Sequence, residues 1–391
     1  LATAVPDRPP GAWHDEPFHA FDHFFVPQLH ALTVVAASSD VPHVGAVIGG
    51  GDRLGIQRWA IAGYGQYAPS LTDHVHWGAD AAYLNNMLAP WQILASAGFL
   101  DWVDPVAVAG GATVGDERRT RDASLSISRT WRGSLTTLAS AVYSDDLDRF
   151  PGAPAIHDRI GGALLDASWT FAETTPYTGL RRGWFGEATA AAYPSALSTF
   201  RGDLYDTRGE LGAIVPLPFG RRHVLFAELR GRAVLARDDT GLLQLGGNSG
   251  FLYQLSASSV ATTPAFDAGR FPADFAFIEN LRGYEDYAIT TDRAAIADLW
   301  YRYPLIIDRG VAATLWLLPA SFLSELDLEL FATGAVDRAH DLHAAVGGQL
   351  TARLALFRLP FVLSYQLARR VRDDDALTHL FGVDVPLATL F

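Results

Sequence analysis

The side chains of this sequence that could do chemistry are few, and they lie in short alternating segments. His74, His76 and Asp80 share one face of residues 74–84 and are the only candidates for a hydrolase group assembled across strands. The sequence lacks the motifs G-x-S-x-G, H-E-x-x-H and Walker A, and it has no G-x-G-x-x-G after a strand. Buried hydrogen bonding explains the three side chains more simply than catalysis does. We therefore expect a protein that is not an enzyme.

Two further groups of residues could bind a metal ion. The segment 13–30 is rich in imidazole and carboxylate side chains, namely His14, His19, Asp22, His23 and His30. His19 and His23 are four residues apart, which would place two imidazoles on one helical face, and the acidic runs 145–149 and 372–376 could hold calcium. A lead-in segment at the membrane interface and two solvated loops are the simpler interpretations. Because the chain also has no cysteine, we predict no metal and no cofactor.

The composition excludes several classes of protein. The chain has 391 residues, 49% of them hydrophobic, but no apolar run long enough for a transmembrane helix, which excludes a helical membrane protein. All 30 basic residues are arginine, and against 43 acidic residues the net charge is -13. No basic stripe with interleaved aromatic residues is present, so we do not expect binding to nucleic acid.

Most of the chain alternates between apolar and polar residues with a period of two, which predicts β-strands. Residues 293–306 set two charged side chains against an apolar face: Asp298 and Arg302 opposite Ala297, Leu299, Tyr301, Tyr303 and Leu305. Residues 320–334 set three carboxylates against leucines: Glu325, Asp327 and Glu329 opposite Leu326, Leu328 and Leu330. A water-soluble sandwich also alternates. It would, however, have to hide the three carboxylates together, which is costly unless all are paired.

The pattern predicts sixteen strands, an even number, with long connections on one rim and short turns on the other. The strands are placed at 29–38, 43–52, 56–67, 74–84, 91–101, 121–131, 134–144, 160–171, 183–193, 199–215, 222–236, 293–306, 320–334, 342–357, 359–371 and 377–391. The long connections include 102–120, 145–159 and 237–292. Such unequal rims are typical of a transmembrane β-barrel, in which a closed sheet satisfies the backbone within lipid. The predicted fold class is therefore all-β, a sixteen-stranded antiparallel barrel in outer-membrane lipid.

The two ends of the chain complete this division into domains. Residues 1–28 are expected to be a periplasmic lead-in segment, and 29–391 the barrel. The last strand, 377–391, places Phe381, Val383, Val385, Leu387 and the terminal Phe391 on one face, a familiar outer-membrane pattern. Pro386 cannot donate to the ladder and interrupts this closing strand. The apolar segment 308–321 is too short to span a membrane and is interpreted as a periplasmic helix, a plug or a surface for a partner.

The residues around 237–292 resemble a known family. Leu281-Arg282-Gly283-Tyr284 is followed, within the predicted strand 293–306, by Trp300-Tyr301-Arg302-Tyr303-Pro304-Leu305, and Leu245-Gly246-Gly247 precedes it. This order resembles the bacterial surface antigen barrels of the BamA/TamA/FhaC superfamily. Those barrels carry V/L-R-G-F/Y in their sixth extracellular loop and then a strand close to E-x-R-F-P-L. Residues 44–67 look like the opening strands of the subset in which a periplasmic β-propeller precedes the barrel.

The resemblance implies that loop six, 237–292, folds into the lumen and that Arg282 docks on the twelfth and thirteenth strands. Gly283 would allow a close backbone approach there, and Tyr284 would pack on the wall beside Leu281. The candidate lumen partners of Arg282 are Glu325, Asp327, Glu329, Asp298 and Arg302. An ordinary loop arginine is the alternative interpretation.

Two positions depart from the family pattern. Trp300 stands where the family has a glutamate, and residues 330–334 lack the aspartate of F-x-D-x-G. Arg282 therefore uses a different carboxylate or is held less tightly. Residues 248–280 look like an insertion that is apolar enough to plug the lumen or cap the barrel.

The family function implied by this resemblance is protein translocation or the insertion of outer-membrane proteins. The first and last strands, 29–38 and 377–391, would part and offer their edges to a client strand. The implied partners are outer-membrane lipid and either a protein client or subunits of an envelope complex, without nucleic acid. The alternative function is a passive pore or a structural outer-membrane anchor of a larger complex.

Overall fold

Most of the chain forms one large antiparallel sheet. A computed structural model of the protein describes residues 23–35, 43–107, 113–132, 134–175, 179–199, 202–220, 223–236, 243–246, 277–284, 288–307, 313–314, 321–356, 359–372 and 376–384. Within these ranges sixteen long strands, β1 to β11, β15 and β17 to β20, make up the sheet, and the two-residue strand β16 adds to it. The predicted all-β fold with sixteen antiparallel strands is confirmed.

Most long strands begin and end within a few residues of the predicted positions. Their bounds are β1 Pro27–Val35, β2 His43–Gly51, β3 Gln57–Tyr67, β4 Val75–Asn85, β5 Trp91–Ala107, β6 Thr113–Trp131, β7 Leu135–Arg149, β8 Ile156–Thr175, β9 Gly179–Tyr193, β10 Leu204–Pro216, β11 Val224–Ala236, β15 Arg293–Ile307, β17 Ser321–Val336, β18 Leu342–Leu356, β19 Leu359–Arg370 and β20 Leu377–Asp384. Among the described residues the only helix is the 3-10 turn Ser195–Leu197. None of the described helical residues forms a helix long and apolar enough to cross a membrane.

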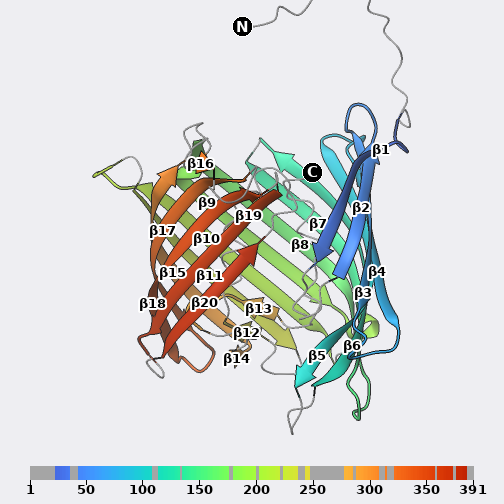
Figure 1. Ribbon diagram of the computed structural model, residues 1–391. Helices are drawn as coiled ribbons and strands as arrows, with labels where there is room; N and C mark the ends of the chain where they lie inside the picture. The colour runs from blue at the N-terminus through green and yellow to red at the C-terminus, as the bar shows by residue number, and fades with distance from the viewer. Residues whose placement is uncertain are drawn as a thin grey trace, which may run out of the picture.

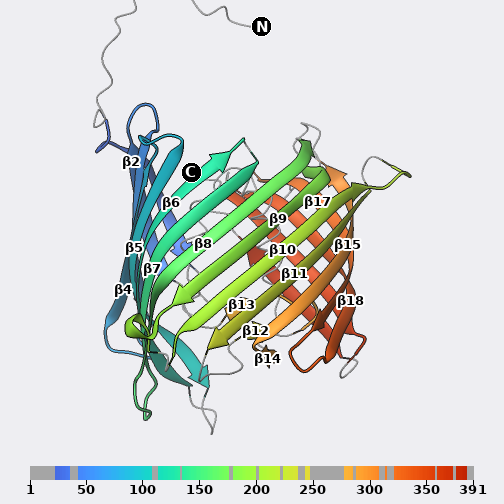
Figure 2. The same cartoon turned by 180° about the vertical axis from the view of Figure 1, so that it is seen from behind.

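Each long strand pairs with the next one along the chain, so the sheet is a meander. β11 pairs with β15 and β15 with β17, because β12 to β14 form a separate small sheet. Figures 1 and 2 show the strands strongly tilted and the sheet curled into a barrel wall. In the part of the chain that the structure describes, β1 pairs with β2, β20 pairs with β19, and no ladder joins β1 to β20.

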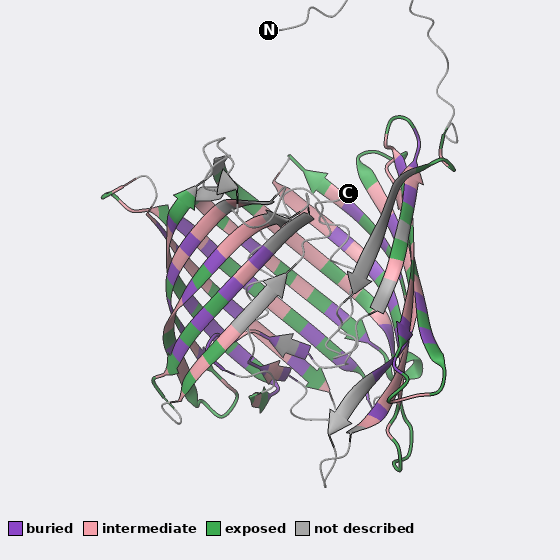
Figure 3. Ribbon diagram, viewed as in Figure 1, coloured by how far each residue is buried: buried purple, intermediate pink, exposed green. Residues whose placement is uncertain are grey.

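Side chains alternate between the inside and the outside of this wall, as the period of two predicts. In β10, Asp206 and Glu210 are buried, whereas Tyr205 and Leu211 are 51% and 54% exposed. Figure 3 shows the same alternation of buried and exposed residues along β17 to β19. The exposed positions include large apolar side chains in strand after strand: Ile61, Trp77, Leu125, Leu165, Trp184, Leu229, Leu299, Leu330, Leu350 and Leu367. An apolar exterior around a polar interior is what lipid contact requires.

The predictions of long connections at 102–120 and 145–159 are wrong, because strands continue through most of these residues. β5 and β6 extend into 102–120 and leave only 108–112 between them. In the same way β7 and β8 extend into 145–159 and leave only 150–155 between them. The acidic run 145–149 is therefore part of β7. Beyond the lipid both faces of a hairpin can meet water, so backbone pairing continues there without apolar alternation. The side chains on such a hairpin can be charged, as the ion pair of Arg118 with Asp146 across β6 and β7 illustrates.

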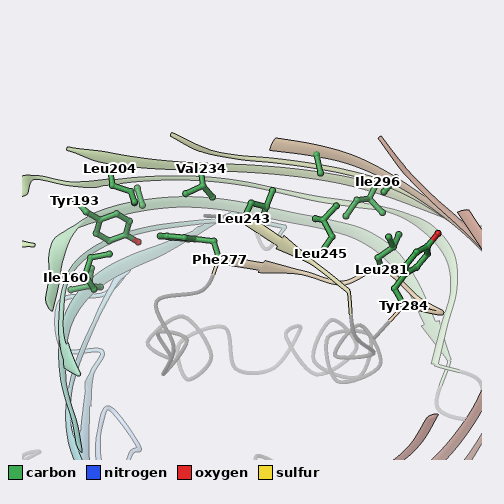
Figure 4. Close-up of a cluster of buried hydrophobic side chains, with 14 of the residues drawn as sticks. Ile160, Tyr193, Leu204, Val234, Leu243, Leu245, Phe277, Leu281, Tyr284 and Ile296 are labelled. Atoms are coloured by element: carbon green, nitrogen blue, oxygen red, sulfur yellow. The ribbon is translucent and has the colours of Figure 1, made fainter. Parts of the chain in front are cut away.

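Loop six contains a second, three-stranded sheet. β12 (Leu243–Leu245) pairs in parallel with β13 (Phe277–Glu279) and antiparallel with β14 (Ile289–Thr291), which leads directly into β15. Figure 4 shows Leu243, Leu245 and Phe277 pointing toward the inner wall. Residues 247–276, most of the predicted insertion, lie outside the described residues. Of the segment 308–321, Ala313–Thr314 form the strand β16 beside β17 rather than a helix, and 308–312 and 315–320 lie outside the described residues.

Candidate functional site

The tetrapeptide Leu281-Arg282-Gly283-Tyr284 follows β13 and is buried along its whole length. Leu281 is fully buried, and Tyr284 is 2% exposed. Both belong to an apolar cluster that joins the small sheet of loop six to wall residues such as Val234 and Ile296 (Figure 4). Burying a large apolar side chain contributes about 1.5–3 kcal/mol. The cluster therefore fixes this end of loop six against the wall.

Gly283 brings the loop backbone into contact with the last strands of the sheet. Its φ of +83° lies in the left-handed region, and a Cβ there would lie 2.8 Å from the Cβ of Ala345 in β18 and 3.0 Å from that of Ala368 in β19. Glycine therefore suits both the conformation and the close approach. The Gly283 carbonyl accepts hydrogen bonds from Arg370 Nε and from Thr378 Oγ1 in β20, each at 3.2 Å.

Arg282 lies between two aromatic rings. Its guanidinium carbon is 5.2 Å from the ring centroid of Trp300 in β15 and 5.1 Å from that of Phe331 in β17. Glu329 Oε2 lies 3.7 Å from Arg282 Nη1, which is the distance of an ion pair rather than of a hydrogen bond. Neither Nη1 nor Nη2 has a hydrogen-bond partner among the described residues. The flat guanidinium therefore interacts chiefly with the ring faces, and Trp300 stands at the position where the family that the sequence resembles has a glutamate.

Glu279, which the sequence did not single out, ties loop six to three wall arginines. We call these the arginine wall: Arg208 in β10, and Arg230 and Arg232 in β11. Glu279 Oε1 accepts a hydrogen bond from Arg208 Nε at 2.8 Å and lies 3.4 Å from Arg232 Nη1, and its Oε2 lies 3.3 Å from Arg230 Nη1. Glu279 is 4% exposed. Because these ion pairs are shielded from water, the Coulomb attraction within each pair is larger than it would be at the surface.

The other predicted partners of Arg282 are paired with different arginines. The contacts are Asp298 with Arg230 at 2.5 Å, Glu325 with Arg302 at 2.8 Å, and Asp327 with Arg302 at 2.7 Å and with Arg353 at 2.8 Å. Among the described residues no ion pair joins Arg282 to these carboxylates, and Arg302 is itself a cation that pairs with Glu325 and Asp327. Of the predicted set, the structure thus brings only Glu329 to Arg282. Which carboxylate meets which arginine depends on the register of separate strands, and alternation within a strand does not determine it.

The inner side of β5, β6 and β7 is built differently. Its polar side chains are mostly serines, which we call the serine wall: Ser96, Ser124, Ser126, Ser128, Ser140 and Ser144. Ser96 and Ser124 are register partners whose hydroxyl oxygens are 2.7 Å apart, and Ser126 and Ser140 are paired in the same way at 2.7 Å. The hydroxyls of these two pairs satisfy each other across neighbouring strands, and Ser128 donates a hydrogen bond to Gln92 Oε1 at 3.3 Å. These side chains therefore need no loop to supply partners.

The remaining predicted residues do not assemble into one site. Asp80 accepts a hydrogen bond from Tyr64 at 2.6 Å, and in the described part of the chain no hydrogen bond joins it to His74 or His76. Phe381 pairs with Tyr365 in the ladder of β19 and β20. Its side chain lies outside the described residues, as do Pro386, Phe391 and the lead-in residues His14, His19 and Asp22.

These contacts can hold a segment of chain in place inside the barrel. Loop six is fixed at two points, by Glu279 on β10 and β11 and by the buried tetrapeptide on β15 to β20. Ion pairs, ring faces and hydrogen bonds of this kind bind and position a segment. The geometry is that of an anchored loop.

The fold of this chain is similar to the folds of solved β-barrel structures. No family model and no curated protein matches the chain. The chain is similar to BamA from Haemophilus ducreyi lacking POTRA domains 1-3, with a TM-score of 0.56 and 11% sequence identity over 92% of this chain and 76% of that one. It is also similar to CdiB from Escherichia coli, with a TM-score of 0.57 and 10% identity over 91% of this chain and 62%, less than two thirds, of that one. At these identities the similarity concerns the fold, and it confirms the predicted barrel-type sheet of antiparallel strands.

Proposed function

We propose that the protein acts in the outer membrane in the translocation of proteins or in the insertion of outer-membrane proteins, without covalent chemistry. The observation that carries the proposal is the seam of the sheet. Within the described residues each end strand has one partner, β2 for β1 and β19 for β20. The fold shared with BamA and CdiB supports the same assignment.

The route that we propose is a lateral gate between β1 and β20. A strand with one unpaired edge presents N–H and C=O groups to which a client strand can add by β-augmentation. The tetrapeptide of loop six lies on the inner side of this edge, because Gly283 accepts a hydrogen bond from Thr378 in β20. In this proposal loop six stabilises β20 from inside the barrel, while the unpaired edge of β20 accepts a client strand.

The gate can be tested by locking it. The chain has no cysteine, so two introduced cysteines would form the only disulfide. We would place one cysteine in β1 and one in β20, select pairs that cross-link completely, and measure how fast the purified barrel in lipid vesicles inserts an unfolded eight-stranded outer-membrane barrel. We expect insertion to stop in the oxidised protein and to recover on reduction. Equal insertion by oxidised and reduced protein would contradict the gate.

A matched control is a disulfide that does not cross the seam. Ile48 in β2 and Ile61 in β3 are register partners, and their side chains are 42% and 47% exposed on the outer face. The double variant Ile48→Cys with Ile61→Cys should insert the client at the same rate in both redox states. If this disulfide blocks insertion as strongly as the seam disulfide does, the loss reflects rigidity of the wall and not closure of a gate.

The competing function, a passive pore or a structural anchor, predicts a different measurement. The small sheet of loop six and its buried cluster occupy part of the interior beside β7 to β18. We therefore expect brief, rare openings in planar bilayers. A steady open conductance in the intact protein, together with unchanged client insertion after locking, would favour the pore.

A further inference from the structure

A cluster of histidine and carboxylate side chains lies away from loop six, on β4 and β6. His74 and His76 flank the first residue of β4, and Glu117 lies near the start of β6. One ligand atom from each of the three residues lies within 4.8 Å of the others. Figure 1 shows these strand ends at the rim where β5 and β6 project. From this cluster we infer a binding site for a divalent transition-metal ion of the zinc type.

The local strand geometry explains why the two histidines converge. Residues two apart in a strand point to the same face, and the rings of His74 and His76 are 4.4 Å apart between centroids. The side chain of Gln66, on the neighbouring strand β3, is hydrogen-bonded to the backbone of Val103 in β5. Its amide accepts a hydrogen bond from Val103 N at 2.8 Å and donates one to Val103 O at 3.0 Å. Val103 is the register partner of Glu117, so this contact carries β6 toward the histidines.

The burial of the His76 side chain is a second, independent observation that points to a bound ligand. It is fully buried, and neither of its ring nitrogens has a hydrogen-bond partner among the described residues. Burying a polar group without a partner is costly. A bound metal ion would satisfy one of these nitrogens at once.

The contacts of each imidazole ring indicate which of its nitrogens would bind the ion. His76 Nδ1 faces Asp101 Oδ1 at 3.5 Å, and His74 Nδ1 is hydrogen-bonded to Asp73 at 3.1 Å. Each imidazole therefore presents Nε2 as the ligand and has a carboxylate behind it, which is how ligating histidines are commonly oriented. Two imidazoles and one carboxylate, with water in the fourth position, form a donor set that zinc favours. The half-exposed side chain of His74 gives the ion a path from solvent.

The proposed ion would join β4 to β6 across β5, at the rim of the barrel. We would purify the folded barrel in detergent after chelation, add zinc chloride alone, and measure bound zinc by equilibrium dialysis with elemental analysis. We expect one zinc per chain. His76→Gln and Glu117→Gln should each weaken binding by about 100-fold or more because each removes a ligand, and Asp101→Asn should weaken it by about 10- to 100-fold.

A matched control separates this site from general binding to histidine. His157 is exposed and pairs with Asp145 on the β7–β8 hairpin, outside the cluster. His157→Gln should leave zinc binding unchanged. Heat-modifiable migration on gels would show that each variant is folded, and Glu117→Gln decides the matter if His76→Gln does not fold. Absence of stoichiometric zinc in the parent protein, or equal loss in His157→Gln and Glu117→Gln, would overturn the inference.

Discussion

The arginine wall and the serine wall provide partners for their buried polar side chains in different ways. Both line the interior of one sheet, and both must satisfy polar groups away from lipid. The serines of β5 to β7 have short side chains, and four of them are hydrogen-bonded in pairs across neighbouring strands. The guanidinium groups of β10 and β11 reach further into the interior, where Glu279 of loop six meets all three.

The comparison explains where loop six lies. A buried guanidinium without a carboxylate is costly, so a wall of arginines favours a segment that brings one. A wall of paired hydroxyls offers no such gain. The ion pairs of Glu279 with β10 and β11 thus follow from the polar chemistry of the two walls. The apolar cluster adds contacts along β7 to β18.

The largest effect is expected from removing the carboxylate that the arginine wall receives. Glu279→Gln leaves three arginines without their shared partner, and breaking a buried ion pair costs about 3–5 kcal/mol. Because Arg208, Arg230 and Arg232 each keep another carboxylate, we expect about 3 kcal/mol. Urea unfolding of the barrel in detergent, followed by tryptophan fluorescence, measures this loss. A change below about 0.5 kcal/mol would mean that loop six is not held through Glu279.

A smaller loss is expected from Gly283→Ala. The left-handed backbone costs a residue with a Cβ about 1–3 kcal/mol, and the added methyl group would press on Ala345 and Ala368. We expect loop six to become sensitive to protease while β5 to β7 stay protected. Gly209→Ala is the control, since a Cβ there would have nothing within 4 Å. Equal protease sensitivity of the two variants would contradict the close approach.

A change of about 1 kcal/mol is expected from Arg282→Lys. Lysine keeps the charge but loses the flat group that lies between Trp300 and Phe331, and such cation–ring contacts are worth about 0.5–2 kcal/mol. The loss should become smaller in a Trp300→Leu background, in which only the Phe331 ring remains, and a double-mutant cycle measures this difference by urea unfolding. Additive effects of the two substitutions would show that the ring does not hold Arg282.

The smallest effect is expected on the serine wall. Ser126→Ala removes one hydroxyl pair with Ser140, and a net hydrogen bond is worth about 0.5–1.5 kcal/mol. We expect a value near the lower end, and no change in the protease sensitivity of loop six. Release of loop six by Ser126→Ala would remove the distinction between the two walls.

Much of the fold could be predicted from the sequence, because one physical constraint dominates it. Lipid outside and polar groups inside impose a period of two, and strands such as β15 and β17 carry it in their own residues. The constraint ends at the rims. There β5 to β8 extend beyond their predicted ends, because a hairpin in water needs no apolar face.

The candidate site could be predicted only in part. Gly283 and Tyr284 are marked by their own residue types, which suit a close approach and packing. The surroundings of Arg282 depend on Trp300 and Phe331, which meet through the register of β15 and β17. Glu279 had a local signal, a lone carboxylate in the apolar run 275–281, but its three arginines come from strands far away in the sequence.

Hydrogen exchange of loop six tests most directly whether the arginine wall holds it. The account predicts that amides of 277–284 exchange as slowly as those of β10 and β11 in the parent protein. In Glu279→Gln they should exchange much faster, while β5 to β7 remain unchanged. Fast exchange of 277–284 in the parent protein, or no difference between the two proteins, would contradict it.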